Sequence, residues 1–165
     1  MSRAVLSIGS NLGDRLGHLR SVVHAAGDAV VAVSGVYETA PWGVSDQDDY
    51  LNAVLVVDDP ERDAAAWLAF GQGCERAADR VRERRWGPRT LDVDVVDVEA
   101  TTSDDPHLTL PHPRAGERAF VLVPWLDADP SAVLAGHPVG QVLAGLPAAE
   151  RAGVRRRDDL RLTAS

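Results

Sequence analysis

The sequence predicts an α+β fold, because apolar residues alternate along some segments and recur at helical spacing along others. These segments follow one another in the order β-α-β-β-α-β, which is the order of the split βαβ, ferredoxin-like plait, with a C-terminal extension. The 165 residues are expected to form one domain, residues 1–165, because no repeat or linker interrupts them.

The first half of the chain supplies four of these elements. Alternation predicts a strand over residues 3–8, and apolar residues at helical spacing predict a helix over residues 14–30. Two further strands are expected at 31–38 and 51–57. The long segment between them, 39–50, is predicted to be a functional loop, because loops of that length are uncommon in compact domains.

The second half begins with a helix predicted to run from Asp59-Pro60 to about residue 78, because proline and an acidic residue suit a first helical turn. A loop over residues 80–90 then leads to a strand that carries Asp92. The remaining expected elements are a short strand at 108–110, helices at 120–126 and 139–143, and an edge strand at 160–162.

Two carboxylates are predicted to share one face of the strand after residue 90. Leu91, Val93 and Val95 alternate with Asp92 and Asp94, so the aspartates lie about 6.6 Å apart along the strand. They could be the solvated face of a half-exposed strand. Aspartate is a poor strand former, however, and two on one face repel each other unless a positive charge lies between them. We therefore predict that they bind a cation such as Mg²⁺.

Arginines accompany these aspartates. Arg85 and Arg89 immediately precede the strand, and His112 stands near Arg114 and Arg118. The arginine run could be a solvated helix end and loop, but guanidinium groups also bind phosphate oxygens in a bidentate fork. Cations held by aspartates next to arginines are typical of phosphoryl transfer. The chain has no lysine, so any cationic role falls to arginine, histidine or a metal.

Composition narrows the classes of partner. The formal charge of −8 argues against a dedicated nucleic-acid binder, and the single cysteine, Cys74, excludes an intramolecular disulfide and a thiolate zinc cluster. The apolar N-terminal run is too short for a signal peptide, and no run has the roughly 18 apolar residues of a membrane span. We expect a cytoplasmic protein without membrane or nucleic-acid partners.

A planar heterocycle is one expected ligand. Asn52 offers a paired donor and acceptor, while Tyr50 and Phe120 offer flat aromatic faces. An ordinary hydrophobic core would equally use the two aromatic residues.

Five motifs occur in a characteristic order along the chain, and they are Gly9–Gly13, Tyr37–Pro41, Gln47–Ala53, Arg85–Asp94 and Leu110–Pro113. Together they resemble the 6-hydroxymethyl-7,8-dihydropterin pyrophosphokinase family of folate biosynthesis. The resemblance covers about residues 3–147, and its most specific part is the segment Arg85–Asp94.

This resemblance implies a three-layer α/β/α sandwich of ferredoxin-like type around a mainly antiparallel sheet. The implied reaction transfers the β,γ-diphosphate of ATP to the hydroxymethyl oxygen of the pterin and releases AMP. The implied cofactors are two Mg²⁺ ions, with ATP as co-substrate, and we expect the protein to be a monomer.

The resemblance also implies roles for individual residues. The implied metal ligands are Asp92 and Asp94, which belong to the catalytic set with Arg80, Arg82 and Arg89. The implied ATP-binding residues are Gln72, Glu75, Arg82, Trp86, Arg89, His112 and Arg118. The implied pterin-binding residues are Thr39, Trp42, Tyr50, Asn52 and Phe120.

Two other functions compete with this one. A non-catalytic ferredoxin-like module that binds RNA or a small ligand would show a basic surface and exposed aromatic residues, and would give no reason for the paired aspartates. A Mg²⁺-dependent nucleotide hydrolase would need a base that positions water near Asp92, and the sequence shows no such residue.

Overall fold

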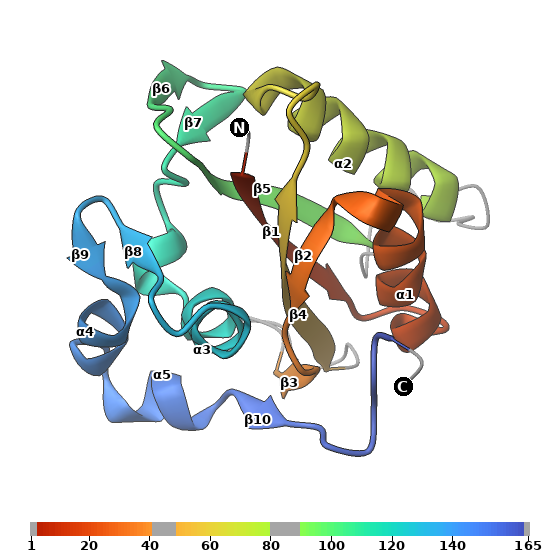
Figure 1. The fold of residues 1–165 in the computed structure, drawn as a ribbon. Coiled ribbons are helices and arrows are strands. Elements are labelled where there is room, and N and C mark those ends of the chain that lie inside the picture. Colours follow the sequence, from red (N-terminus) through yellow and green to blue (C-terminus); the bar gives the residue numbers. More distant parts are fainter. Residues whose placement is uncertain (1–2, 41–48, 80–89, 164–165) are drawn as a thin grey trace.

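The computed structural model describes residues 3–40, 49–79 and 90–163, and its centre is an antiparallel sheet (Figure 1). The strand order is β10-β3-β4-β1-β5, with β2 paired to β4 beside β3. Since β1 lies between β4 and β5, the predicted ferredoxin-like α+β order is confirmed. The strands of this sheet are β1 (Arg3–Ser10), β2 (Val30–Val33), β3 (Tyr37–Thr39), β4 (Tyr50–Asp58), β5 (Asp92–Val98) and β10 (Arg155–Arg156).

Helices cover both faces of the sheet and create the three layers that were expected (Figure 1). On one face, Leu19 of α1 and Trp67 of α2 pack on Leu6 and Ile8. On the other face, residues of α3 pack on apolar side chains of β1, β4 and β5. The helices are α1 (Arg15–Ala26), η1 (Gly27–Ala29), α2 (Ala64–Asp79), η2 (Ala115–Glu117), α3 (Ala119–Ala128), α4 (Val139–Ala144) and α5 (Ala148–Ala152).

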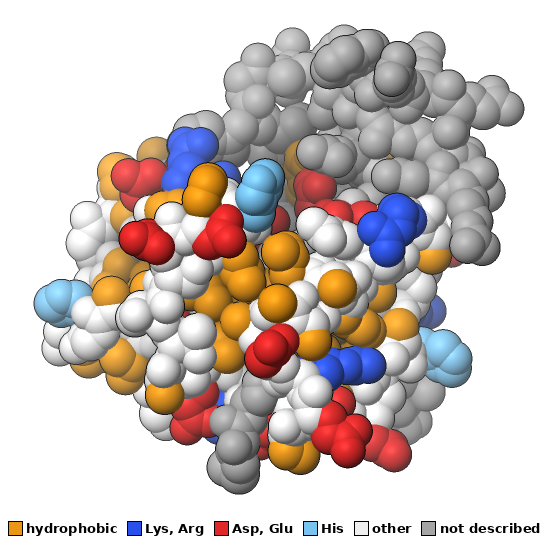
Figure 2. Space-filling model, turned by 90° about the horizontal axis from the view of Figure 1, so that it is seen from above, with side chains coloured by type: hydrophobic (Ala, Val, Ile, Leu, Met, Phe, Trp, Pro, Cys, Tyr) orange, Lys and Arg blue, Asp and Glu red, His pale blue; other side chains and the backbone are white. Residues whose placement is uncertain are grey.

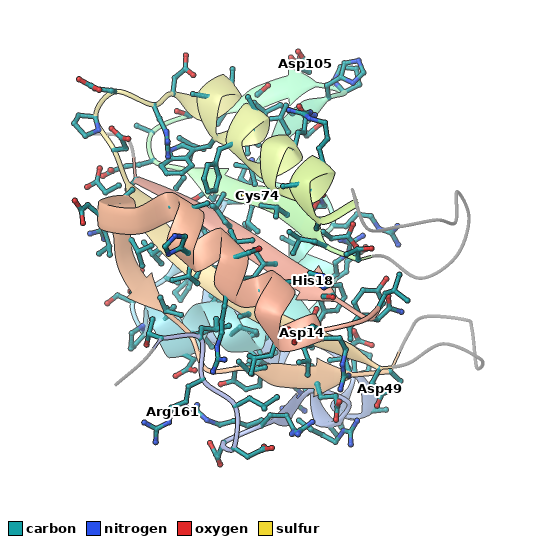
Figure 3. All side chains as sticks on the ribbon, turned by 90° about the vertical axis from the view of Figure 1, so that its right-hand side faces the viewer. Asp14, His18, Asp49, Cys74, Asp105 and Arg161 are labelled. Carbon is teal, nitrogen blue, oxygen red and sulfur yellow. The ribbon has the colours of Figure 1, made fainter. Side chains whose placement is uncertain are left out.

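The first helix is shorter than predicted. Asp14 caps its N-terminus by accepting a hydrogen bond from the backbone N–H of Gly17, 3.0 Å away (Figure 3 labels Asp14). Its C-terminal residue is Ala26, because Gly27 adopts φ of 54°, a left-handed value that ends an α-helix. The helix therefore stops four residues before the expected end at residue 30.

The start of α2 corrects the prediction that the helix begins at Asp59-Pro60. Asp59 instead forms a turn, in which its carboxylate accepts a hydrogen bond from the N–H of Glu61 at 2.9 Å. Asp63 caps the helix by accepting from the N–H of Ala66 at 2.8 Å. Two aspartates four residues apart both suit a cap, and the second is the one used. Cys74 lies within α2, as predicted, and burial raises the pKa of its thiol (Figure 3).

Helix α2 packs closely on β5 at a glycine, and this contact gives a stability prediction. A Cβ on Gly71 would lie 2.9 Å from Cγ1 of Val93 and 3.4 Å from its carbonyl oxygen. Because Val93 is buried and stiff, Gly71→Ala should lower the free energy of unfolding by about 1–3 kcal/mol in urea titrations. Gly73→Ala is the matched control, since its Cβ would come no nearer than 3.9 Å to Arg76. It should be neutral or raise stability by up to about 1 kcal/mol. Equal changes in the free energy of unfolding for Gly71→Ala and Gly73→Ala would contradict this close packing of α2 on β5.

The strand predicted at 31–38 is broken into β2 and β3. At the break, the Ser34 hydroxyl accepts a hydrogen bond from the N–H of Val54 at 2.9 Å, and the N–H of Gly35 donates to Asp127 at 2.7 Å. The backbone N–H of Ser34 still donates to the carbonyl of Val54 at 3.0 Å, but side chains take over the other bonds at this point, which the alternating pattern could not reveal.

The edge strand predicted at 160–162 is also wrong. The strand that pairs with β3 is β10, while Leu160 and Leu162 pack against the hydrophobic core on the α1 side. Arginines hold β10 in place: Arg155 forms an ion pair with Asp49 at 2.8 Å, and Arg156 with Asp127 at 3.2 Å.

Two short hairpins complete the described chain. The strand predicted at 108–110 is β7 (Leu108–Leu110), which pairs with β6 (Ser103–Asp105), and β8 (Val133–Leu134) pairs with β9 (His137–Pro138). None of the helices in the described ranges has the length and apolar character needed to cross a membrane. Figure 2 shows arginine side chains as separate spots on the visible face. The absence of nucleic-acid binding stays a prediction.

Candidate active site

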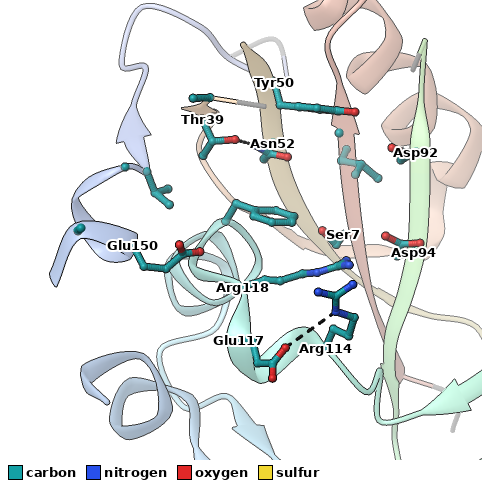
Figure 4. Close-up of a pocket in the computed structure, with 17 residues that line it drawn as sticks. Ser7, Thr39, Tyr50, Asn52, Asp92, Asp94, Arg114, Glu117, Arg118 and Glu150 are labelled. Atoms are coloured by element: carbon teal, nitrogen blue, oxygen red, sulfur yellow. Dashed lines mark hydrogen bonds and ion pairs between the residues drawn. The ribbon is translucent and has the colours of Figure 1, made fainter. Parts of the chain in front are cut away.

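An open cavity of about 660 Å³ lies on the face of the sheet that carries α3 (Figure 4). Its floor consists of β1, β4 and β5, and its walls come from β3, from η2 with the start of α3, and from α5. The predicted site residues that line this cavity are Thr39, Tyr50, Asn52, Asp92, Asp94, Arg118 and Phe120. The structure therefore brings together both carboxylates and most of the expected heterocycle-binding set.

The register of the sheet arranges the cavity floor in two rows. In one row Gly9 of β1 lies between Asn52 of β4 and Asp92 of β5. In the next row Ser7 lies between Val54 and Asp94. Directly paired residues point to the same face, so all of these side chains lie on the face of the sheet that carries the cavity, although Val54 is buried in the core beneath α3. The absence of a side chain on Gly9 leaves room for the amide of Asn52, since a Cβ there would lie 2.9 Å from Oδ1 of Asn52.

Asp92 and Asp94 share one face of β5, as predicted. Both are half-buried, whereas Val93 and Val95 between and beyond them are buried against α2 on the opposite side. In the described residues no cluster of three or more histidine, cysteine or acidic side chains could enclose a metal. A cation held by these two carboxylates would complete its shell with water and ligand oxygens. That is the usual way Mg²⁺ binds beside phosphates, so the site fits this ion.

His112 lies next to the Asp94 end of the cavity as a neutral hydrogen-bond donor. Its backbone N–H donates to the carbonyl of Val96 at 2.7 Å, and its ring Nδ1 accepts from the backbone N–H of Arg114 at 3.2 Å. The neutral ring therefore carries its proton on Nε2. Burial lowers the pKa of His112, the charge of Asp94 raises it, and Arg118 and Arg114 lower it further.

This lowered pKa predicts how stability depends on pH. Between the folded pKa of His112 and its ordinary value of 6.5, the unfolded chain binds a proton that the folded chain does not. His112 therefore reduces stability as the pH falls through this window. The melting temperature of His112→Gln should drop less than that of the wild type between pH 7 and pH 5. The exposed histidine of α1 gives the control His24→Gln, which should follow the wild type. An identical drop in all three proteins would contradict the burial argument.

The opposite end of the cavity holds the polar and aromatic groups suited to a heterocycle. Asn52 is 4% exposed, and its Nδ2 donates to the hydroxyl of Thr39 at 2.8 Å. This bond fixes the amide so that Oδ1 lies over Gly9. Tyr50 and Phe120 both line the cavity, and the guanidinium of Arg118 lies 5.6 Å from the ring centre of Phe120.

Comparison with known proteins decides the family. The model of the 7,8-dihydro-6-hydroxymethylpterin-pyrophosphokinase (HPPK) family matches residues 5–130. The chain belongs to the HPPK family. It is 52% identical over 168 residues to the 2-amino-4-hydroxy-6-hydroxymethyldihydropteridine pyrophosphokinase of Mycobacterium tuberculosis H37Rv, covering 94% of this chain and 89% of that one. The Bacillus subtilis enzyme of the same name is 40% identical over 129 residues, covering 75% and 76%.

Solved structures support the fold of this HPPK chain. The wild-type HPPK-DHPS of Plasmodium falciparum superposes with a TM-score of 0.66 at 12% identity, over 87% of this chain and 44% of that one. An HPPK-DHPS crystallised with substrates gives a TM-score of 0.62 at 11% identity, over 87% and 43%. This chain thus spans less than half the length of those two proteins.

Three described residues that the HPPK resemblance assigns to ATP lie outside the cavity lining: His112, Glu75 and Gln72. The Glu75 carboxylate accepts a hydrogen bond from the N–H of Val93 at 2.9 Å, which ties α2 to β5 directly between the two aspartates. Gln72 is exposed on α2. The remaining predicted site residues lie outside the described residues, and they are Trp42, Arg80, Arg82, Trp86 and Arg89.

One wall of the cavity lies beyond the part of the chain that the resemblance covers. The resemblance extends to about residue 147, yet α5 and the residues after it contribute Glu150 and Val154 to the lining. The ion pairs of β10 anchor this segment to the body of the protein. Ser7 and Arg114 also line the cavity without having been predicted, although the strand pattern alone places Ser7 on the same face as Gly9.

Proposed function

We propose that the two ends of this cavity bind Mg²⁺-ATP and the hydroxymethyl-dihydropterin side by side for diphosphoryl transfer. As a member of the HPPK family, the protein is a pyrophosphokinase acting on this pterin in folate synthesis. The β,γ-diphosphate of ATP would pass to the hydroxymethyl oxygen, with AMP as the leaving group.

One observation supports this placement most strongly. Asn52 and Asp92 flank Gly9 in a single row of the sheet, so they are two strand spacings, about 10 Å, apart. A bicyclic ring held by Asn52 can therefore extend its hydroxymethyl group to the carboxylates across the open floor at Gly9. Gly9 itself adds no side chain to this path.

At the carboxylate end, Asp92 and Asp94 would bind the cations, and we propose two ions as in the implied reaction. Such ions would neutralise charge on the phosphate oxygens and orient them. Nε2 of His112 can donate a hydrogen bond to a phosphate oxygen, because its other ring nitrogen already accepts one from Arg114. The permanent charge of Arg118, at the cavity wall, would attract the same diphosphate unit.

At the other end, the amide of Asn52 would read the polar edge of the pterin, with its orientation set by Thr39. Tyr50 and Phe120 would contact the faces of the ring. A monomeric state and a cytoplasmic location stay predictions from the sequence.

The nucleotide product tests this function. The protein is incubated with ATP, Mg²⁺ and 6-hydroxymethyl-7,8-dihydropterin, and the nucleotides are separated by chromatography. AMP should form in equal amount to a diphosphorylated pterin. ADP as the product, or AMP formed equally well without the pterin, would contradict the proposal and favour an ordinary kinase or a hydrolase.

A further inference from the structure

Ser7 places a hydroxyl in the cavity floor, where it has no hydrogen-bond partner among the described residues. The residue is 5% exposed and lines the cavity from the middle of β1. Among the residues that the structure describes, none forms a hydrogen bond with this hydroxyl. Ser34, another buried serine beside β4, donates to the carbonyl of Gly35 at 2.7 Å and accepts from Val54. The Ser7 hydroxyl is not one of the fully buried atoms that lack a partner, so it is open to the cavity, where a ligand can supply its hydrogen bond.

The position of Ser7 limits which part of a ligand it can meet. Its neighbours in the same row are Val54 and Asp94, and the adjacent row contains Gly9. Neither Val54 nor Gly9 offers a polar side chain. Figure 4 shows Ser7 in the floor between Asn52 and Asp94, which belong to the heterocycle end and the carboxylate end of the cavity.

We propose that Oγ of Ser7 hydrogen-bonds the hydroxymethyl oxygen of the pterin and positions it beside Asp94. This inference rests on the proposed function, which places the ring at Asn52 and the phosphates at Asp92 and Asp94. The group that joins these two ends is the hydroxymethyl arm, which must cross the floor at Gly9 and Ser7. A serine hydroxyl both donates and accepts, so it can bind an alcohol oxygen and leave a lone pair of that oxygen directed at phosphorus.

Binding of two ligands to two proteins isolates this contact. Affinities of 6-hydroxymethylpterin and 6-methylpterin are measured by calorimetry with wild type and Ser7→Ala, in Mg²⁺ and a nonhydrolysable ATP analogue. Ser7→Ala should weaken the binding of 6-hydroxymethylpterin by about 2- to 13-fold, which is the range expected for the loss of one hydrogen bond. It should leave the affinity for 6-methylpterin unchanged, because that ligand lacks the hydroxymethyl oxygen.

Stability separates a binding role from a structural one. Ser7→Ala removes no hydrogen bond within the described chain, so its melting temperature should equal or exceed that of the wild type. Ser34→Ala is the matched control. It loses two bonds and should melt at a lower temperature while keeping both pterin affinities.

Three results would overturn the inference. The first is an equal loss of affinity for both pterins in Ser7→Ala, and the second is no loss of affinity at all. The third is a loss of affinity for the ATP analogue alone, which would assign Ser7 to the phosphates. If the wild type forms AMP and binds 6-hydroxymethylpterin, any of these outcomes rejects the Ser7 contact and leaves the proposed function standing. A wild type that binds neither pterin would reject both.

Discussion

Replacing Asp92 or Asp94 by asparagine is expected to reduce kcat by roughly 10³-fold, because each variant removes a negative ligand from the proposed cation site. Charge stabilisation by a metal contributes several kcal/mol to a transition state, and each 1.4 kcal/mol is about tenfold in rate. The two carboxylates share one face of β5 and open into the cavity. Steady-state assay of AMP formation at saturating Mg²⁺ measures the loss.

The same strand supplies a control for this experiment. Asp97 is a half-buried aspartate of β5 that does not line the cavity, and burial raises the pKa of its carboxyl. Asp97→Asn should keep wild-type kcat. Asp94→Asn should melt no lower than the wild type, because it relieves repulsion between two like charges. Wild-type activity in the Asp92/Asp94 double variant would show that the cation site is wrongly assigned.

Replacing Asn52 by alanine is expected to lower kcat/KM for the pterin by about 10²-fold or more. The reason is that polar groups of the bound ring would lose their hydrogen-bond partner, which a site built on hydrogen bonds tolerates poorly. The KM for ATP should change by less than about threefold, since Asn52 lies at the opposite end of the floor from Asp92 and Asp94. Steady-state kinetics with each substrate varied in turn gives both values.

Thr39→Val provides the graded comparison. It removes only the hydroxyl that accepts a hydrogen bond from Nδ2 of Asn52 at 2.8 Å. It should therefore lower kcat/KM for the pterin less than Asn52→Ala does. Melting temperatures establish that both variants are folded. Equal losses of affinity for ATP and for the pterin in Asn52→Ala would contradict the division of the cavity into two ends.

The sequence predicted the parts of the site that depend on local periodicity. A period of two residues places Asp92 and Asp94 on one face whatever the sheet around them, and the structure confirms this. Tyr50, Asn52 and Phe120 were grouped by chemistry, and they meet in one cavity. The fold also followed from the order of elements, because short connections leave few ways to arrange β-α-β-β-α-β.

Features that depend on contacts between distant segments could not be predicted. Ser7 becomes a candidate ligand contact only when the β1–β5 register places it beside Asp94. The cavity wall at Glu150 depends on how β10 pairs with β3, and arginines of β10 hold this pairing in place. In the sequence these arginines look like part of a charged tail. Likewise, the break at Ser34 arises from a hydrogen bond to Val54, 20 positions further along the chain.

A crystal structure with Mg²⁺, a nonhydrolysable ATP analogue and 6-hydroxymethylpterin tests most directly whether one cavity brings both substrates together. We expect cations on Asp92 and Asp94, the pterin between Tyr50 and Phe120 with its edge on Asn52, and the hydroxymethyl oxygen in line with the β-phosphorus. A pterin bound outside this cavity, or phosphates without contact to either aspartate through a cation, would contradict the account.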